Sequence, residues 1–205
     1  MYYALGVKRA WLVLAICGPN VGIAHADKPD DFVDVVPLIP DAVLDLRYAT
    51  EHNFTGKQVY PVAHCKLRRA VAAKLVQAAK TLRAADRRLL IYDCYRPSSI
   101  QAVFWKLVPD ERYVANPKQG SRHSRGAAVD VGVVDKAGHP VALPTEFDDF
   151  SEAAHRDHAL KGERGAEARR LEAAMQAAGF IGMPTEWWHF DDAAATTYPL
   201  SDDPL

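Results

Sequence analysis

Apolar residues recur at helical spacing in three stretches of this 205-residue chain. The clearest stretch has apolar side chains at three- and four-residue steps: Leu67, Val71, Leu75, Ala78 and Leu82. This spacing predicts an amphipathic helix over residues 65–85. A second helix is expected from Pro97 to about residue 108, with a serine as its N-terminal cap. A third is expected over residues 163–178, ended by Gly179.

Short apolar and β-branched runs between these helices predict strands. Residues 89–93 and 127–134 are expected to be buried strands, the second followed by a hairpin turn at residues 135–138. A further strand is expected over residues 181–190, and an extended segment with one or two short strands over residues 33–48. Because short turns join several strands, the pattern favours an α+β fold over a parallel doubly wound one. We expect a mainly antiparallel sheet with helices packed on it.

The first 26 residues have the order of a secretory signal peptide. A basic pair precedes a short apolar run over residues 10–17, and the small-residue site Ala24-His25-Ala26 follows. We therefore expect residues 1–26 to be a signal peptide and residues 27–205 to be a single domain, with a peripheral tail from Asp191. Cleavage near Ala26 would place this domain in the periplasm or outside the cell. The formal net charge of −1 argues against a nucleic-acid partner, and no later segment is long and apolar enough to cross a membrane.

Two cysteines, Cys65 and Cys94, would remain after cleavage. An oxidising compartment allows them to form a disulfide. Two separate buried thiols are the alternative, and the sequence does not choose between these states. Cys17 also raises the alternative of a lipoprotein, but a lipidated cysteine generally follows a small residue and Ile16 precedes this one.

The first candidate for chemistry is the segment Ser-Arg-His-Ser-Arg-Gly-Ala-Ala-Val-Asp, which runs from Ser121 to Asp130. His123 lies in a polar loop, whereas Asp130 lies on an otherwise apolar strand. A carboxylate there is costly to bury unless it is paired or bound to a metal. The alternative is a loop histidine and an ordinary salt bridge.

The second candidate is Glu186-Trp-Trp-His189. Positions three apart on a regular strand face opposite sides, so both polar groups reach one site only at a kink or a strand end. The alternative is an aromatic edge strand with surface polar groups. Together the two segments supply three ligands and a spare carboxylate, as a catalytic zinc requires. Arg96 follows a predicted strand, from which its guanidinium could stabilise an oxyanion.

These motifs, together with Tyr95-Arg96-Pro97, resemble the VanX-type zinc D-alanyl-D-alanine dipeptidases. That family belongs to a D,D-peptidase group that shares its metal-binding α+β fold with the hedgehog signalling domain. The resemblance runs from about residue 35 to residue 190. It includes residues 46–50, 53–56 and 145–148, which look specific to the dipeptidase branch.

The resemblance implies one Zn²⁺ per chain and hydrolysis of the D-alanyl-D-alanine dipeptide to two D-alanines by a Glu-activated zinc-bound water. It assigns eight residues: His123, Asp130 and His189 as zinc ligands, Glu186 as general base and then acid, Arg96 as transition-state stabiliser, Ser121 as a contact of the substrate carboxylate, and Asp148 with Tyr48 as contacts of the substrate ammonium.

Two other functions remain open at this point. A D,D-carboxypeptidase acting on peptidoglycan stem peptides would need an open groove. A non-catalytic zinc-binding recognition module would not need Glu186 and Arg96. The sequence leaves open the oligomeric state and the physiological role, which could be nutrient scavenging, cell-wall remodelling or glycopeptide resistance.

Overall fold

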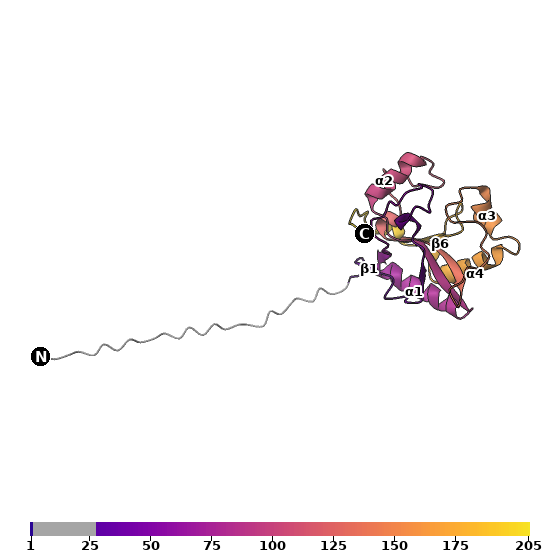
Figure 1. Cartoon of the computed structure of the whole chain (residues 1–205), viewed down its shortest axis with the longest axis horizontal. Coiled ribbons are helices and arrows are strands. Elements are labelled where there is room, and N and C mark those ends of the chain that lie inside the picture. Colours follow the sequence, from indigo (N-terminus) through magenta and orange to yellow (C-terminus); the bar gives the residue numbers. More distant parts are fainter. Residues whose placement is uncertain (2–27) are drawn as a thin grey trace.

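The computed structural model describes residue 1 and residues 28–205 of the chain (Figure 1). The predicted signal peptide and the lipoprotein alternative at Cys17 therefore fall on residues outside the described part. Among the described residues, no helix combines the length and apolar character that a membrane span requires.

A five-stranded sheet forms the centre of the fold. Its strands, in spatial order, are β2 (Val43–Leu44), β4 (Arg87–Asp93), β5 (Ala128–Asp135), β7 (His189–Asp192) and β6 (Phe180–Gly182). Only the pairing of the short β2 with β4 is parallel, so the expected mainly antiparallel α+β sheet is confirmed. A second, two-stranded sheet pairs β1 (Phe32–Asp34) with β3 (Lys66–Arg68).

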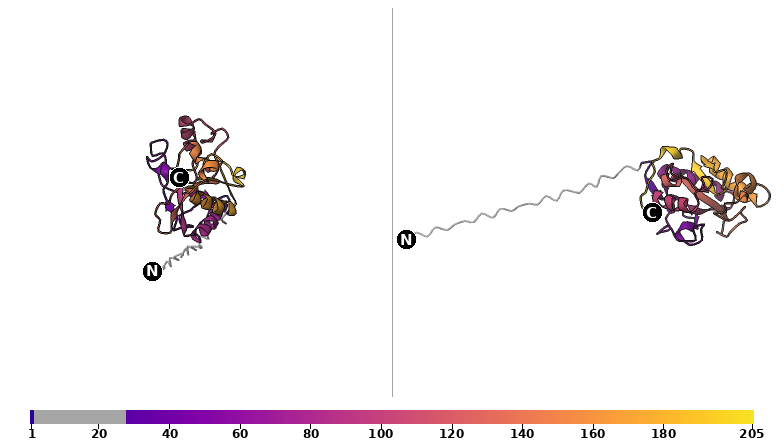
Figure 2. Two further views of the ribbon diagram at one scale, coloured as in Figure 1. Left: turned by 90° about the vertical axis from the view of Figure 1, so that its right-hand side faces the viewer. Right: turned by 90° about the horizontal axis from the view of Figure 1, so that it is seen from above.

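Helices cover the sheet unequally. Within residues 28–205 the four α-helices are α1 (Arg69–Arg83), α2 (Ser98–Leu107), α3 (Arg156–Ala159) and α4 (Gly165–Ala177). Helices α1 and α4 pack together against the sheet, with Leu75, Leu82 and Leu171 fully buried. They lie below the sheet in Figure 1, whereas α2 lies above it; the side view of Figure 2 shows the same separation. This arrangement leaves the edge and upper face of the sheet to loops.

The expected helix over residues 65–85 begins later than its apolar spacing suggested. Residues Lys66–Arg68 form β3, and Cys65 is bonded to Cys94 in a buried disulfide. Pairing with β1 and the covalent link hold this segment extended, so the helix starts at Arg69. Local periodicity does not report either long-range constraint.

The expected strand over residues 181–190 is also wrong as a single element. It is divided into β6 and β7, which pair with each other across the turn that contains residues 183–188. The Met183 amide donates to the His189 carbonyl at 3.1 Å, which closes this turn. The division supplies the kink that Glu186 and His189 require to face one site.

The tail is not peripheral, contrary to expectation. Asp191 belongs to β7, and the last residues pack beneath the start of α2. The Asp202 carboxylate accepts the Ser99 amide at 2.7 Å, and the Ser201 amide donates to the Ser124 carbonyl at 2.8 Å. No side chain of α2 caps its own first turn, so the expected serine cap is wrong: the tail provides the cap.

Candidate active site

Three buried side chains converge above the sheet. Asp130 on β5 lies directly opposite His189 on β7, and such pairs share a face of an antiparallel sheet. His123 comes from a short 3-10 turn, His123–Arg125, which is closed by Gly126 in the left-handed region. Each side chain offers one possible ligand atom, an imidazole nitrogen or a carboxylate oxygen, and these three atoms lie within 4.8 Å of one another. These are the three predicted metal ligands.

The hydrogen bonds of the two imidazoles show that the cluster suits a cation. His123 Nδ1 lies 2.7 Å from the Cys94 carbonyl, and His189 Nε2 lies 3.0 Å from the Asp191 carboxylate. Because a carbonyl and a carboxylate only accept, both nitrogens donate. In the neutral rings the other two nitrogens then carry lone pairs, and they face each other at 3.2 Å beside Asp130. Three acceptor groups at one buried point require a proton or a metal cation between them.

In the metal-free chain a proton serves this purpose. Burial lowers the pKa of His189, but the carboxylates of Asp191 and Asp130 outweigh burial and raise the pKa well above its ordinary value. A bound divalent cation would displace that proton, since metal ligands bind in their deprotonated forms.

Glu186 lies beside the cluster without belonging to it. Its carboxyl is buried, and Oε2 is 3.8 Å from His189 Nδ1. The turn between β6 and β7 directs Glu186 to the same side as His189, while Trp188 lines the cavity next to it. Burial raises the pKa of the Glu186 carboxyl to about 8, against the opposing effect of the His189 charge. A carboxyl with such a pKa can both accept and return a proton near neutral pH.

Arg96 is buried and held from two sides. Its Nη2 donates to Asp93 at 2.6 Å and its Nη1 to the Gln101 amide oxygen at 2.8 Å. The guanidinium also lies over the Phe104 and Tyr48 rings, at 4.6 and 5.2 Å from their centroids. Burial lowers the pKa of Arg96, but the Asp93 carboxylate outweighs burial, so the pKa stays well above its ordinary value. The group is a fixed positive charge.

The opposite end of the site carries Asp148 and Tyr48. The Tyr48 hydroxyl donates to Asp148 Oδ1 at 2.9 Å, and the Phe54 amide lies 3.3 Å from Oδ2. Burial raises the pKa of the Asp148 carboxyl to about 7. Ser121 is buried near the ligands, and its hydroxyl oxygen accepts the His123 amide at 3.1 Å.

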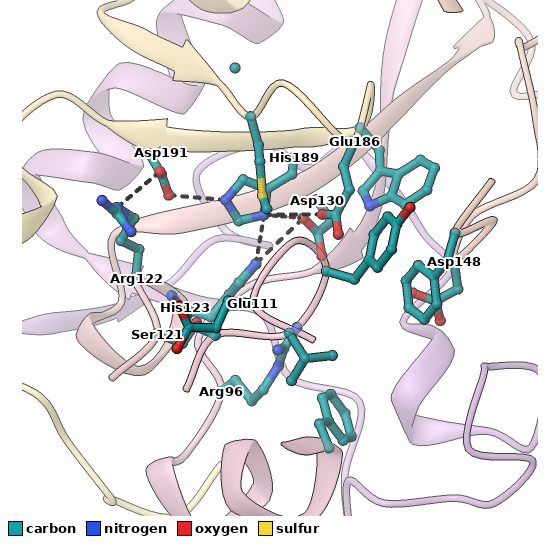
Figure 3. A pocket seen from close by; sticks show the side chains of 18 of the residues that line it. Arg96, Glu111, Ser121, Arg122, His123, Asp130, Asp148, Glu186, His189 and Asp191 are labelled. Atoms are coloured by element: carbon teal, nitrogen blue, oxygen red, sulfur yellow. Dashed lines mark hydrogen bonds and ion pairs between the residues drawn. The ribbon is translucent and has the colours of Figure 1, made fainter. Parts of the chain in front are cut away.

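One cavity of about 340 Å³ joins all of these groups. Its lining includes every one of the eight residues that the resemblance assigned: Tyr48, Arg96, Ser121, His123, Asp130, Asp148, Glu186 and His189. Figure 3 shows Asp148 on one side of the ligand cluster and Arg122 with Asp191 on the other. The disulfide lies outside the lining but next to it, because Cys94 supplies the carbonyl that binds His123.

Comparisons with known sequences agree with this geometry. The family described as D-ala-D-ala dipeptidase, Peptidase_M15, matches residues 28–203. The chain belongs to this dipeptidase family. A D-alanyl-D-alanine dipeptidase of Escherichia coli K12 is 36% identical over 174 residues, covering 84% of this chain and 90% of the relative. The protein of the same name from Enterococcus faecalis V583 is 34% identical, and the match covers 78% of this chain and 86% of that relative. The one from Streptomyces coelicolor is 30% identical, and the match covers 78% of this chain and 90% of that relative.

Membership of the dipeptidase family confirms the resemblance inferred from the motifs. The roles of individual residues, including the metal ligands, stay predictions that the cavity supports. The sequence interpretation missed three polar residues around them: Gln101, Arg122 and Asp191. The alternation His-Phe-Asp after Trp188 could have indicated that Asp191 shares a strand face with His189. Gln101 and Arg122 gave no comparable local signal.

Proposed function

We propose that this protein hydrolyses D-alanyl-D-alanine to two D-alanines, with one zinc ion held by His123, Asp130 and His189. The observation that carries the proposal is the composition of one cavity: three acceptor side chains at a point, a separate buried carboxyl and a buried guanidinium. The names of the relatives support the substrate. Two imidazoles and a carboxylate with a further position open are typical ligands of catalytic zinc.

When bound there, zinc would polarise the peptide carbonyl and lower the pKa of a water molecule. Glu186 then accepts the proton of the attacking water and returns it to the leaving amine. Its raised pKa reflects the metal-free site; a cation beside it would favour the ionised form that a general base requires.

Arg96 stabilises the negative charge that develops on the carbonyl oxygen. A guanidinium has five N–H groups, and the bonds to Asp93 and Gln101 engage Nε and one N–H on each terminal nitrogen. Within residues 28–205, one N–H on each terminal nitrogen is therefore left for the substrate. Because its partners already orient the group, little reorganisation is needed as the charge forms.

The two ends of the cavity recognise the two ends of the dipeptide. Asp148, oriented by Tyr48, binds the substrate ammonium, and the Ser121 hydroxyl binds the carboxylate. A stem peptide ending in the same dipeptide keeps the carboxylate but has an uncharged amide in place of the ammonium, which would leave Asp148 unpaired and disfavours this substrate. The small cavity therefore favours a dipeptidase over a D,D-carboxypeptidase. A signal peptide would place this reaction in the periplasm or outside the cell, where wall-derived dipeptide is available.

The test is Glu186→Gln, assayed by release of D-alanine from D-alanyl-D-alanine. We expect zinc to be retained and turnover to fall by about 10²–10⁴-fold. Glu163→Gln, the same change at an exposed surface position, is the matched control and should leave turnover unchanged. Near-normal turnover in Glu186→Gln would contradict the assigned role.

The substrate requires a separate comparison. The wild-type protein is given free D-alanyl-D-alanine or a pentapeptide ending in the same dipeptide, each with and without a chelator. We expect rapid, chelator-sensitive hydrolysis of the dipeptide alone. Preferred cleavage of the pentapeptide would indicate a carboxypeptidase, and binding without cleavage would indicate a recognition module.

A further inference from the structure

The second ring nitrogen of His189 has a charged partner. Nδ1 faces Asp130 at 3.0 Å, on the side of the proposed zinc position, whereas Nε2 faces the Asp191 carboxylate at 3.0 Å. The other histidine of the cluster differs in its hydrogen bond, because its Nδ1 donates to the uncharged Cys94 carbonyl at 2.7 Å and the Asp93 carboxylate lies farther away, at 3.7 Å. The two proposed ligands are thus oriented by chemically different groups.

The geometry of β7 places Asp191 in this position. Residues two apart on a strand share a face, so Asp191 lies on the same side as His189. Asp192 lies on the other side, where its buried carboxylate accepts Lys74 of α1 at 2.6 Å. Two adjacent aspartates therefore have separate environments, one against the proposed ligand and one against a helix.

Arg122 holds the second oxygen of Asp191. Its Nε lies 3.0 Å from Oδ2, while Oδ1 accepts His189. Arg122 immediately precedes His123 in the chain, so the ion pair joins the two segments that carry the histidines (Figure 3). The Arg122 side chain is 49% exposed. An exposed ion pair contributes little to overall stability, which leaves orientation as its main effect.

We propose that Asp191, oriented by Arg122, is a positioning residue that keeps the His189 proton on Nε2 and directs the Nδ1 lone pair to the metal. This inference rests on the proposed zinc site and extends it to residues outside the ligand set. A carboxylate that accepts the distal N–H of a ligand imidazole fixes its tautomer and ring orientation and makes the nitrogen a better donor. Without that partner the ring can rotate and present Nε2 instead.

The experiment measures the zinc dissociation constant of the full domain by competition with a chromophoric chelator. Removing a partner of this kind weakens metal binding by about 10–100-fold, which we expect for Asp191→Ala. Asp191→Asn retains an acceptor oxygen without the charge, so its loss should be smaller. Arg122→Gln should weaken binding by a few-fold, since Asp191 remains. The nitrogen-15 shifts of His189 in the zinc-loaded wild type should show Nε2 protonated.

Asp192→Asn is the matched control. It should lower the unfolding midpoint, because the ion pair with Lys74 is weakened, and leave zinc affinity within about twofold. Asp191→Ala should instead weaken zinc binding and leave the unfolding midpoint nearly unchanged. Zinc affinity within twofold of wild type in a folded Asp191→Ala protein, or His189 coordinated through Nε2, would overturn the inference alone. A wild-type protein that neither binds zinc nor cleaves the dipeptide would overturn the proposed function as well.

Discussion

Replacing Asp148 by asparagine should be more favourable to stability at high pH than at low pH. Asp148 has a positive φ of 63°, a conformation that asparagine tolerates better than most residues. The substitution therefore keeps the shape and the backbone while removing the charge. It also removes one of the two acceptor oxygens that bind the Tyr48 hydroxyl and the Phe54 amide.

The magnitude follows from the pKa, which burial raises from 3.8 to about 7. The folded chain holds this proton to a higher pH than the unfolded chain, so wild-type stability falls as pH rises between these values. At about 1.4 kcal/mol per pKa unit the full effect is roughly 4 kcal/mol, of which about 2–3 kcal/mol develops between pH 5 and pH 8. Loss of one acceptor costs about 1–3 kcal/mol at either pH.

The assay is urea unfolding of wild type and Asp148→Asn with a chelator present, at pH 5 and pH 8. We expect the variant to gain about 2–3 kcal/mol relative to wild type between the two pH values. The exposed Glu163→Gln variant should show no such gain. An equal stability difference between wild type and Asp148→Asn at both pH values would refute the reasoning. With zinc present, the same substitution should raise KM for the dipeptide, because its ammonium loses a partner.

Three further predictions concern the supports of the site. Replacing both cysteines of the disulfide by alanine should lower the unfolding free energy by about 3–4 kcal/mol, since the bond closes a 29-residue separation; a loss below 1 kcal/mol in urea would contradict this. Gly126→Ala places a Cβ 2.3 Å from the Phe32 ring at a positive φ, whereas Gly56→Ala has a positive φ but open space around its Cβ. Gly126→Ala should therefore lower the unfolding free energy by about 1–3 kcal/mol more than Gly56→Ala. Equal shifts of the two melting temperatures would exclude the clash. Asp202→Ala should cost about 1 kcal/mol by removing the cap of α2, with turnover unchanged.

The sequence predicted that His123, Asp130 and His189 would lie together, because short segments of the chain carry these residues. Glu186 and His189 are the two ends of a four-residue segment with two tryptophans between them, and one loop with the strand after it carries His123 and Asp130. Spacing within such a short segment does not depend on how distant parts of the chain fold. The existence of three helices and a mostly antiparallel sheet was predictable for the same reason, from local apolar periodicity.

The errors in the start of α1, the cap of α2 and the placement of the tail arose where distant segments decide local structure. Residues 66–68 have a helical pattern but pair with β1, and the cap of α2 comes from Asp202, about 100 positions away. Asp191 and Gln101 act on the site only through the folded sheet and loop. No short window of the sequence contains both partners of the β1–β3 pairing or of the α2 cap, whereas Asp191 and Gln101 lie two and five residues from the side chains that they contact.

Sheet register connects these observations to the chemistry. Asp130 faces its neighbours across two strands at once: His189 on β7 and Asp93 on β4. The pairing of β4 shifts between Ile91 and Asp93, an irregularity that re-aims the end of the strand, where Asp93 holds Arg96. A slip of one residue in β5 would send Asp130 to the face covered by helices and separate it from both histidines. The buried valines on either side of Asp130, Val129 and Val131, therefore serve the site as well as the core, because the packing of β5 against α4 favours this register.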